Sequence, residues 1–350
     1  MAKITLRLAL AAGLAAPAPR QAASPQPALR EAAGRIGLLV GAAADPAHFS
    51  EPEYAGTLAH EFNMIEPENA MKWTHTEPAR GEFDFGPGDQ VVSFAEAHHM
   101  KVRGHNLLWG IHNPAWLADG HSSAAELRDI MQRHVARVAG HYAGKVFAWD
   151  VVNEAFDKNG ALAHSIWFDH PGIGLADKGT AYIEQAFRWA HEADPKALLF
   201  YNDYAAEGLN AKSDAIYAMV KDFKQRGVPI DGLGLQMHVS IADAANLSST
   251  LDASISRLAA LGVQVQITEL DVGLPIAAGG QPRDPADAQR QADLYGLVAR
   301  VCAANPGCTA FQTWGFTDKY SWIPNFSHGQ RGAGLLFDAG YKPKLSYDAV

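Results

Sequence analysis

The sequence is poor in cysteine, in positive charge and in long apolar runs. Its only two cysteines, Cys302 and Cys308, have no histidine pair nearby, so a cysteine-based zinc site is not expected. No stretch of 18 or more apolar residues occurs, so we expect no membrane-spanning helix. Lys and Arg number 29 against 38 Asp and Glu, and the net charge of -9 argues against nucleic-acid or anionic-membrane partners.

Signature motifs of several enzyme classes are also missing. No G-x-G-x-x-G follows the first strand-like run and no phosphate loop occurs, which argues against a nucleotide-binding doubly wound sheet. The serine-hydrolase elbow G-x-S-x-G and the zinc motif H-E-x-x-H are absent as well. We therefore expect neither a catalytic metal nor a cofactor.

The pattern that is present alternates short strand-like runs with helical segments. The strand-like runs are rich in β-branched and aromatic residues, and the helical segments carry apolar residues at three- and four-residue spacing. The predicted strands are 36–42, 62–67, 102–109, 147–153, 197–201, 233–237, 263–268 and 309–314. The predicted helices are 91–98, 124–142, 180–193, 211–226, 251–261 and 287–303. This order predicts an α/β fold with a single-domain (β/α)8 TIM barrel.

The amino terminus has a different composition. Lys3 and Arg7 precede the apolar run 8–16, and an Ala-, Pro-, Gln- and Ser-rich stretch follows. This pattern is typical of a secretory signal, here residues 1–23, followed by a short leader or linker at 24–35 and the folded domain at 36–350. We therefore expect a secreted protein, extracellular or periplasmic. The alternative is an Ala-rich leader that carries no targeting signal.

Two glutamates end apolar runs and carry the strongest chemical signal. Glu154 ends the run that begins at Phe147, and Glu269 ends the run that begins at Val263. At the carboxyl ends of parallel strands in one barrel, both would face the same cavity. One acid and one base or nucleophile are the minimum equipment for cleaving a glycosidic bond. Ordinary salt bridges at strand ends are the alternative for either glutamate alone.

Polar and aromatic residues follow nearly every predicted strand, as a barrel active site requires. They are Glu68, Asn69 and Lys72 after the second strand, His105 and Trp109 at the third, and Asn153 and Glu154 at the fourth. Asn202, Asp203 and Tyr204 follow the fifth, Gln236 and His238 the sixth, Glu269 and Asp271 the seventh, and Trp314 and Trp322 the eighth.

The surroundings of the two glutamates suggest different roles. Glu154 lies in a Trp-, Val- and Phe-rich segment, which favours the raised pKa that a general acid needs. Glu269 must stay ionised, and His238 and Asp271 are plausible orienting partners. Asn153 could bond a sugar 2-hydroxyl, a contact that strengthens in the transition state.

Aromatic residues near the strand ends offer faces on which a sugar ring can stack. Trp314 and Trp322 are candidates for this contact. For Trp73 and Trp149 we expect core packing instead.

Four stretches resemble the endo-β-1,4-xylanases of glycoside hydrolase family 10. They are Pro67-Glu-Asn-Ala-Met-Lys-Trp73, Arg103-Gly-His-Asn-Leu-Leu-Trp109, Trp149-Asp-Val-Val-Asn-Glu154 and Ile267-Thr-Glu-Leu-Asp271. The resemblance runs from about residue 36 to the carboxyl terminus. It implies a (β/α)8 barrel, a retaining mechanism and xylan or xylo-oligosaccharides as the substrate, and we expect a monomer.

The resemblance also implies a role for each matched residue. Glu154 corresponds to the acid/base, Glu269 to the nucleophile, and His238 and Asp271 to the groups that support the nucleophile. The implied substrate-binding residues are Glu68, Asn69, Lys72, His105, Trp109, Asn153, Tyr204, Gln236, His238, Trp314 and Trp322. Cys302 and Cys308 resemble the family's short disulfide, although from their spacing alone two free thiols remain open.

The chain departs from the family pattern after the third predicted strand. Gly110 stands where a histidine is expected and His112 where a glutamine is expected to contact the glycone sugars. Ala205 follows Tyr204, where asparagine is frequent. These positions bear on how the substrate is held and not on the two carboxylates.

Two alternatives differ from the xylanase hypothesis in testable ways. A barrel hydrolase for another β-1,4-glycan, such as cellulose or mixed-linkage glucan, would not be expected to keep the segment from Glu68 to Trp73. A sugar-binding or inhibitor protein with a catalytically inactive barrel would be expected to lack Glu154 or Glu269, and both are present.

Overall fold

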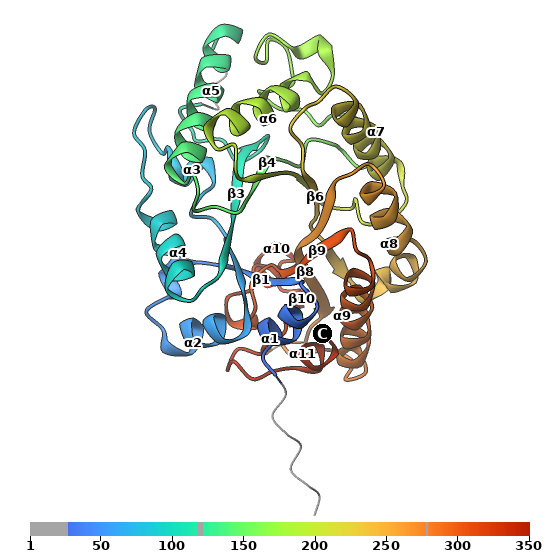
Figure 1. Ribbon diagram of the computed structural model, residues 1–350. Helices are drawn as coiled ribbons and strands as arrows, with labels where there is room; N and C mark the ends of the chain where they lie inside the picture. The colour runs from blue at the N-terminus through green and yellow to red at the C-terminus, as the bar shows by residue number, and fades with distance from the viewer. Residues whose placement is uncertain (1–26, 118–121, 278) are drawn as a thin grey trace, which may run out of the picture.

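The computed structural model describes residues 27–117, 122–277 and 279–350. The predicted signal, residues 1–23, therefore lies outside the described residues. Eight parallel strands alternate with helices around a ring (Figure 1), which confirms the predicted (β/α)8 barrel. These strands are β1 (Leu39–Ala44), β2 (Met64–Pro67), β3 (Lys101–Trp109), β4 (Ala148–Asn153), β5 (Leu198–Asp203), β6 (Gly232–Leu235), β8 (Gln264–Pro275) and β9 (Cys308–Thr313).

The barrel closes because the last strand pairs with both the first strand and its predecessor. β9 lies parallel to β1, with Leu39 opposite Ala310, and parallel to β8, with Val265 opposite Cys308. Each of the other strands pairs in parallel with the next barrel strand in the sequence. All eight carboxyl ends therefore meet at one end of the barrel, where βα loops build active sites.

Helices surround the barrel (Figure 1), and α5 and α7 begin at side chains that cap them. Ser123 Oγ accepts the Glu126 N–H at the start of α5, and Asn210 forms a capping box with Ser213 at the start of α7. The helices are α1 (Leu29–Arg35), α2 (Pro52–Glu61), α3 (Trp73–Thr76), α4 (Gly86–Ala97), α5 (Ala124–His141), α6 (Ala181–Ala193), α7 (Ala211–Gln225), α8 (Ala244–Ala259), α9 (Asp287–Ala304), α10 (Ile323–Phe326) and α11 (Leu345–Ala349). Within the described ranges, no helix combines the length and apolarity needed to cross a membrane.

The structure corrects the predicted boundaries near the amino terminus. Residues 29–35, which we assigned to a leader or linker, form helix α1, and its Leu29 and Ala33 are buried in the core. The Leu29 N–H donates to Glu61 on α2. The folded domain therefore begins before residue 36, and the first strand begins at Leu39 instead of Ile36.

The strand that carries Glu269 is longer than predicted. β8 continues to Pro275 because two short strands pair with its extension: β7 (His238–Ser240) in parallel and β10 (Arg331–Gly332) antiparallel. Glu269 thus lies inside a long strand and not at its end. The Glu269 N–H donates to the Gln236 carbonyl at 3.0 Å, which ties the backbone at this residue to the segment that follows β6.

Candidate active site

Glu154 and Glu269 both lie at the carboxyl end of the barrel; Glu269 is buried and Glu154 is partly buried. Glu154 follows directly after β4, and Glu269 lies on β8. Apart from the extension of β8, this is the placement that the strand pattern predicted. The surroundings of the two carboxyl groups differ, and they drive the two pKa values apart.

Glu269 is surrounded by hydrogen-bond donors. His238 Nε2 lies 2.9 Å from its Oε2, and Asn202 Nδ2 donates to its Oε1 at 2.7 Å. Burial alone would raise the pKa of Glu269, but these donors outweigh burial and hold the pKa below its ordinary value. Glu269 is therefore an ionised carboxylate at neutral pH.

His238 lies between two carboxylates. Its Nδ1 is 2.8 Å from Asp271 Oδ2, which also accepts the Trp322 Nε1–H at 2.8 Å. Burial lowers the pKa of His238, yet Asp271 and Glu269 together raise it to about 10. The imidazolium form can donate to both carboxylates at once, which orients Glu269 and favours its charge.

In Glu154 the effect of burial on the pKa outweighs that of the hydrogen bonds, the opposite of Glu269. Trp109 Nε1 donates to its Oε2 at 3.1 Å, and Gln236 Nε2 donates to its Oε1 at 2.9 Å. Burial raises the pKa of Glu154 above its ordinary value, the negative charge of Glu269 adds to this, and the bond from Gln236 opposes it. A carboxyl group that keeps its proton more tightly than usual can act as a general acid.

Three amide side chains connect the two carboxyl groups. Asn153 Oδ1 accepts one hydrogen bond from Asn202 Nδ2 at 2.9 Å and another from Gln236 Nε2 at 3.2 Å. This fixes the orientation of the Asn153 amide. Its Nδ2 is buried and has no hydrogen-bond partner among the described residues, so one donor of this network remains unpaired.

The residues predicted to bind the glycone sugars gather around Lys72. Its Nζ donates to Asn69 Oδ1 at 2.9 Å and lies 5.3 Å from the Trp109 ring centroid and 5.5 Å from that of Trp314. Burial raises the pKa of Glu68 to about 7, against the opposing charge of Lys72. Charged and aromatic groups that could face a sugar thus stand together.

His105 belongs to a buried ionic cluster within the barrel. Its Nδ1 is 3.0 Å from Asp150 Oδ2 and 3.3 Å from Glu66 Oε1. A ligand-like set of Glu66, His105 and Asp150 could suggest a metal site. Arg103 forms ion pairs with both carboxylates, however, and so supplies the positive charge that a cation would otherwise bring.

Tyr204 stands at the margin of the site. It follows β5 with its side chain partly exposed, and Lys212 Nζ lies 3.5 Å from its ring centroid. The structure does not bring Tyr204 into the network of hydrogen bonds around the two carboxyl groups, and its contact with substrate stays a prediction.

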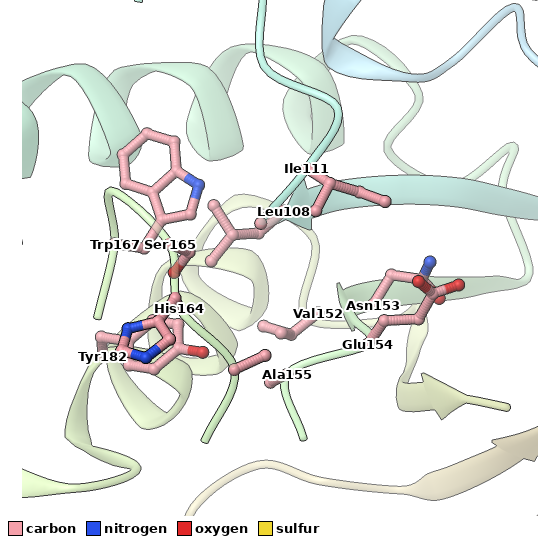
Figure 2. A pocket seen from close by; sticks show the side chains of 12 residues that line it. Leu108, Ile111, Val152, Asn153, Glu154, Ala155, His164, Ser165, Trp167 and Tyr182 are labelled. Carbon is pink, nitrogen blue, oxygen red and sulfur yellow. The ribbon is translucent and has the colours of Figure 1, made fainter. Parts of the chain in front are cut away.

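Two of the departures from the family pattern, Gly110 and His112, lie near Glu154 or its partner Trp109. His112 stacks on Trp109 with ring centroids 4.2 Å apart, and burial followed by the charge of Lys72 lowers its pKa to about 4. A Cβ on Gly110 would lie 3.1 Å from the Ser165 Cβ. Gly110 lines a small pocket in which Val152 and Ala155 separate Glu154 from His164, Ser165 and Trp167 (Figure 2).

The remaining predictions concern cysteines and tryptophans. Cys302 and Cys308 form a disulfide. Trp73 and Trp149 are buried, as expected for core residues, and Trp73 stacks on His134.

Sequence reasoning did not assign a role to Asn202. Its Nδ2 contacts both Asn153 and Glu269, and its Oδ1 accepts the Thr268 hydroxyl at 2.8 Å. Its place at the end of the fifth strand was the only signal available. The role of Asn202 depends on how side chains from three strands point toward one another. The periodicity of the sequence gives no information on these directions.

Comparisons with known proteins give one consistent result. The sequence profile of Glycosyl hydrolase family 10 matches residues 28–350. The chain is 41% identical over 325 residues to endo-1,4-beta-xylanase B of Thermotoga neapolitana, covering 92% of this chain and 90% of that protein.

Solved structures agree with this match. Xylanase 10B from Thermotoga petrophila RKU-1, solved in complex with xylobiose, superposes with a TM-score of 0.87 at 39% identity, covering 94% of this chain and 97% of that one. TsXylA, described as an intracellular xylanase from Thermoanaerobacterium saccharolyticum, gives a TM-score of 0.81 at 37% identity, with 93% and 98% covered.

Proposed function

This chain belongs to glycosyl hydrolase family 10, and on that premise we propose that Glu154 is the acid/base and Glu269 the nucleophile of an endo-1,4-β-xylanase. The observation that carries the assignment is the opposite tuning of the two carboxyl groups. The pKa of Glu154 is raised by burial and by Glu269, whereas that of Glu269 is lowered by its hydrogen bonds. A retaining glycosidase needs one protonated acid and one carboxylate at the same bond.

The reaction then takes two steps. In the first, Glu154 gives its proton to the glycosidic oxygen while the Glu269 carboxylate attacks the anomeric carbon, so that the xylan chain breaks and a glycosyl-enzyme ester forms. In the second, Glu154 takes a proton from water, the water oxygen attacks the same carbon, and Glu269 leaves. Two inversions retain the configuration of the product.

Other residues of the site support this chemistry. The free Asn153 Nδ2 is suited to bond the sugar 2-hydroxyl, a contact that strengthens as the ring gains positive charge. His238 and Asp271 hold Glu269 ionised and oriented. Glu68, Asn69 and Lys72 are proposed to bind the glycone sugars, His105, Gln236, Trp314 and Trp322 to surround the cleaved residue, and Tyr204 to lie on the leaving-group side. Trp109 is proposed as a further substrate contact.

Alanine variants of the two glutamates test the assignment. Glu269→Ala should lose activity on xylan and on activated aryl xylobiosides alike, because no covalent intermediate can form. Glu154→Ala should lose activity on xylan but keep the first step on a dinitrophenyl xylobioside, whose leaving group needs no proton. Glu192→Ala, which removes an exposed glutamate on α6, is the control. Equal losses on both substrates in Glu154→Ala would contradict the acid assignment.

The same assays separate the alternatives. Faster hydrolysis of carboxymethyl-cellulose than of xylan would favour a different β-1,4-glycan as the substrate. A sugar-binding protein would show no turnover, so turnover that Glu269→Ala abolishes excludes it.

We also infer that the protein is exported as a monomer. The basic start, the apolar run 8–16 and the Ala- and Pro-rich stretch after it support export, whereas the monomeric state is carried over from the resemblance to the family. Sequencing the amino terminus of the exported protein should find a start near residues 18–24, and light scattering should give the mass of one chain. A protein retained in the cell with an intact amino terminus would contradict this proposal.

A further inference from the structure

Glu154 has a backbone conformation that needs support. Its φ is 56°, in the left-handed region that non-glycine residues rarely adopt. Such a conformation persists only where neighbours hold it. The direction of the Glu154 side chain follows from this turn, so groups that fix the turn also fix the position of the carboxyl group.

Groups on β5 and in the loop that follows β4 bind the peptide groups on both sides of Glu154. The Glu154 N–H donates to the Asn202 carbonyl at 2.9 Å, and the Ala155 N–H donates to the Tyr201 hydroxyl at 2.9 Å. The Ala155 carbonyl accepts the Ala163 N–H at 2.9 Å. Of these partners, only the Tyr201 hydroxyl belongs to a side chain and can be removed by substitution.

Tyr201 is itself held by a buried ionic group. Its hydroxyl donates to Asp203 Oδ2 at 2.5 Å, and Asp203 Oδ1 lies 2.7 Å from Lys212 Nζ and accepts the Tyr204 N–H at 2.9 Å. Tyr201, Asp203 and Lys212 are all fully buried. Burial keeps the pKa of Tyr201 well above its ordinary value, so its hydroxyl retains the proton that it donates.

We propose that Tyr201, held by Asp203 and Lys212, is a positioning residue that aims the carboxyl group of Glu154 at the glycosidic oxygen. Its hydroxyl makes two hydrogen bonds: it accepts the Ala155 N–H and donates to Asp203. Glu269 has separate partners, His238 and Asn202, so loss of the hydroxyl should disturb the acid and spare the nucleophile. This inference rests on the proposed function, because it assumes that Glu154 is the acid.

The assay compares aryl β-xylobiosides whose leaving groups range from dinitrophenol to phenol. For each, kcat/KM reports the first chemical step, and its dependence on the leaving group measures how well the acid delivers its proton. Tyr201→Phe keeps the ring and removes only the hydroxyl. We expect kcat/KM to fall about 10- to 100-fold with phenol as the leaving group and less than about threefold with dinitrophenol.

Tyr142→Phe is the matched control. Tyr142 lies at the end of α5, away from both carboxyl groups, and is also fully buried. Its hydroxyl donates to the Phe85 carbonyl. This variant should keep the wild-type dependence on the leaving group. A Tyr201→Phe variant that loses activity equally across the series, or loses none, overturns the positioning role.

Two further variants keep the outcomes separable. Glu154→Ala tests the premise: if its kcat/KM shows no increased dependence on the leaving group, the proposed function itself fails. If Glu154→Ala shows that dependence and Tyr201→Phe does not, only the positioning role fails. Should Tyr201→Phe unfold at the assay temperature, Asp203→Asn, which weakens the acceptor of the Tyr201 hydroxyl, is measured in the same series and decides by the same criterion.

Discussion

The imidazole of His238 lies 2.9 Å from the Glu269 carboxylate and carries a positive charge at neutral pH. That charge exists because Asp271 lies on the other side of the ring, 2.8 Å away. Asp271 therefore influences the nucleophile without touching it. The pH dependence of catalysis can show this influence.

Removal of the negative charge at Asp271 should move the acidic limb of the pH profile upward. In Asp271→Asn the imidazolium of His238 is less favoured, so Glu269 loses part of the interaction that lowers its pKa. Glu269 must be ionised to attack, so activity would then appear only at higher pH. The measurement is kcat/KM against pH on xylo-oligosaccharides, with Asp293→Asn on the exposed face of α9 as control. An unchanged or lowered acidic limb would count against this role of Asp271.

Gln236 should control the basic limb. Its hydrogen bond to Glu154 Oε1 lowers the pKa of that carboxyl group. In Gln236→Ala the pKa of Glu154 should rise, and because the first step needs Glu154 protonated, the basic limb should move to higher pH. KM should also rise if Gln236 contacts the sugar. A basic limb that moves downward would show that Glu154 is not the group titrating there.

Glu51 should stabilise the fold except in acid. It accepts hydrogen bonds from Lys319 and from the hydroxyls of Tyr320 and Tyr341, and these lower its pKa to about 2. A carboxyl group with a lowered folded-state pKa stabilises the protein above its unfolded value near 4.5, and this contribution fades as the pH falls from 4.5 towards 2.

Thermal melts of Glu51→Gln check this expectation. The variant should melt below the wild type at pH 7, and the difference should shrink in acid and at high salt. Glu53→Gln, two residues away and exposed on α2, is the control and should melt like the wild type. A difference in melting temperature between Glu51→Gln and the wild type that grows in acid would contradict this expectation.

The disulfide should matter for stability and not for catalysis. Cys302 and Cys308 are six positions apart, and Cys308 begins β9 at the end of the barrel opposite the site. Closing so short a loop contributes about 2 kcal/mol. The double alanine variant should melt roughly 3–6 °C lower, with unchanged kcat/KM at 25 °C. Loss of activity without a change in melting temperature would contradict this expectation.

The sequence predicted the barrel and the positions of both carboxyl groups because each depends on local patterns. Buried strands and amphipathic helices have recognisable periods, and Glu154 and Glu269 each end an apolar run, which indicated the carboxyl ends of two strands. The extension of β8 was missed because it depends on pairing with β7 and with β10, and β10 lies far along the chain. Helix α1 was missed because its short, Ala-rich segment resembles the leader before it.

The site was harder to predict than the fold. The bonds from Asn202 to Asn153 and Glu269 join residues on three strands, and they depend on side-chain rotamers. The hydrogen bond from the Ala155 N–H to the Tyr201 hydroxyl depends on the left-handed backbone conformation of Glu154. A glutamate in a sequence does not predict that conformation. Such contacts become visible only when the strands are placed side by side.

The central claim is that Glu269 forms a covalent bond to the sugar, and trapping that bond tests it most directly. A dinitrophenyl 2-deoxy-2-fluoro-β-xylobioside should react once and stall, because its leaving group departs readily while fluorine slows the second step. Mass spectrometry of the digested protein should find one fluorinated xylobiosyl group on the peptide that contains Glu269, and none in Glu269→Gln. A label on another residue, or an active enzyme that releases product of inverted configuration without any label, would contradict the account.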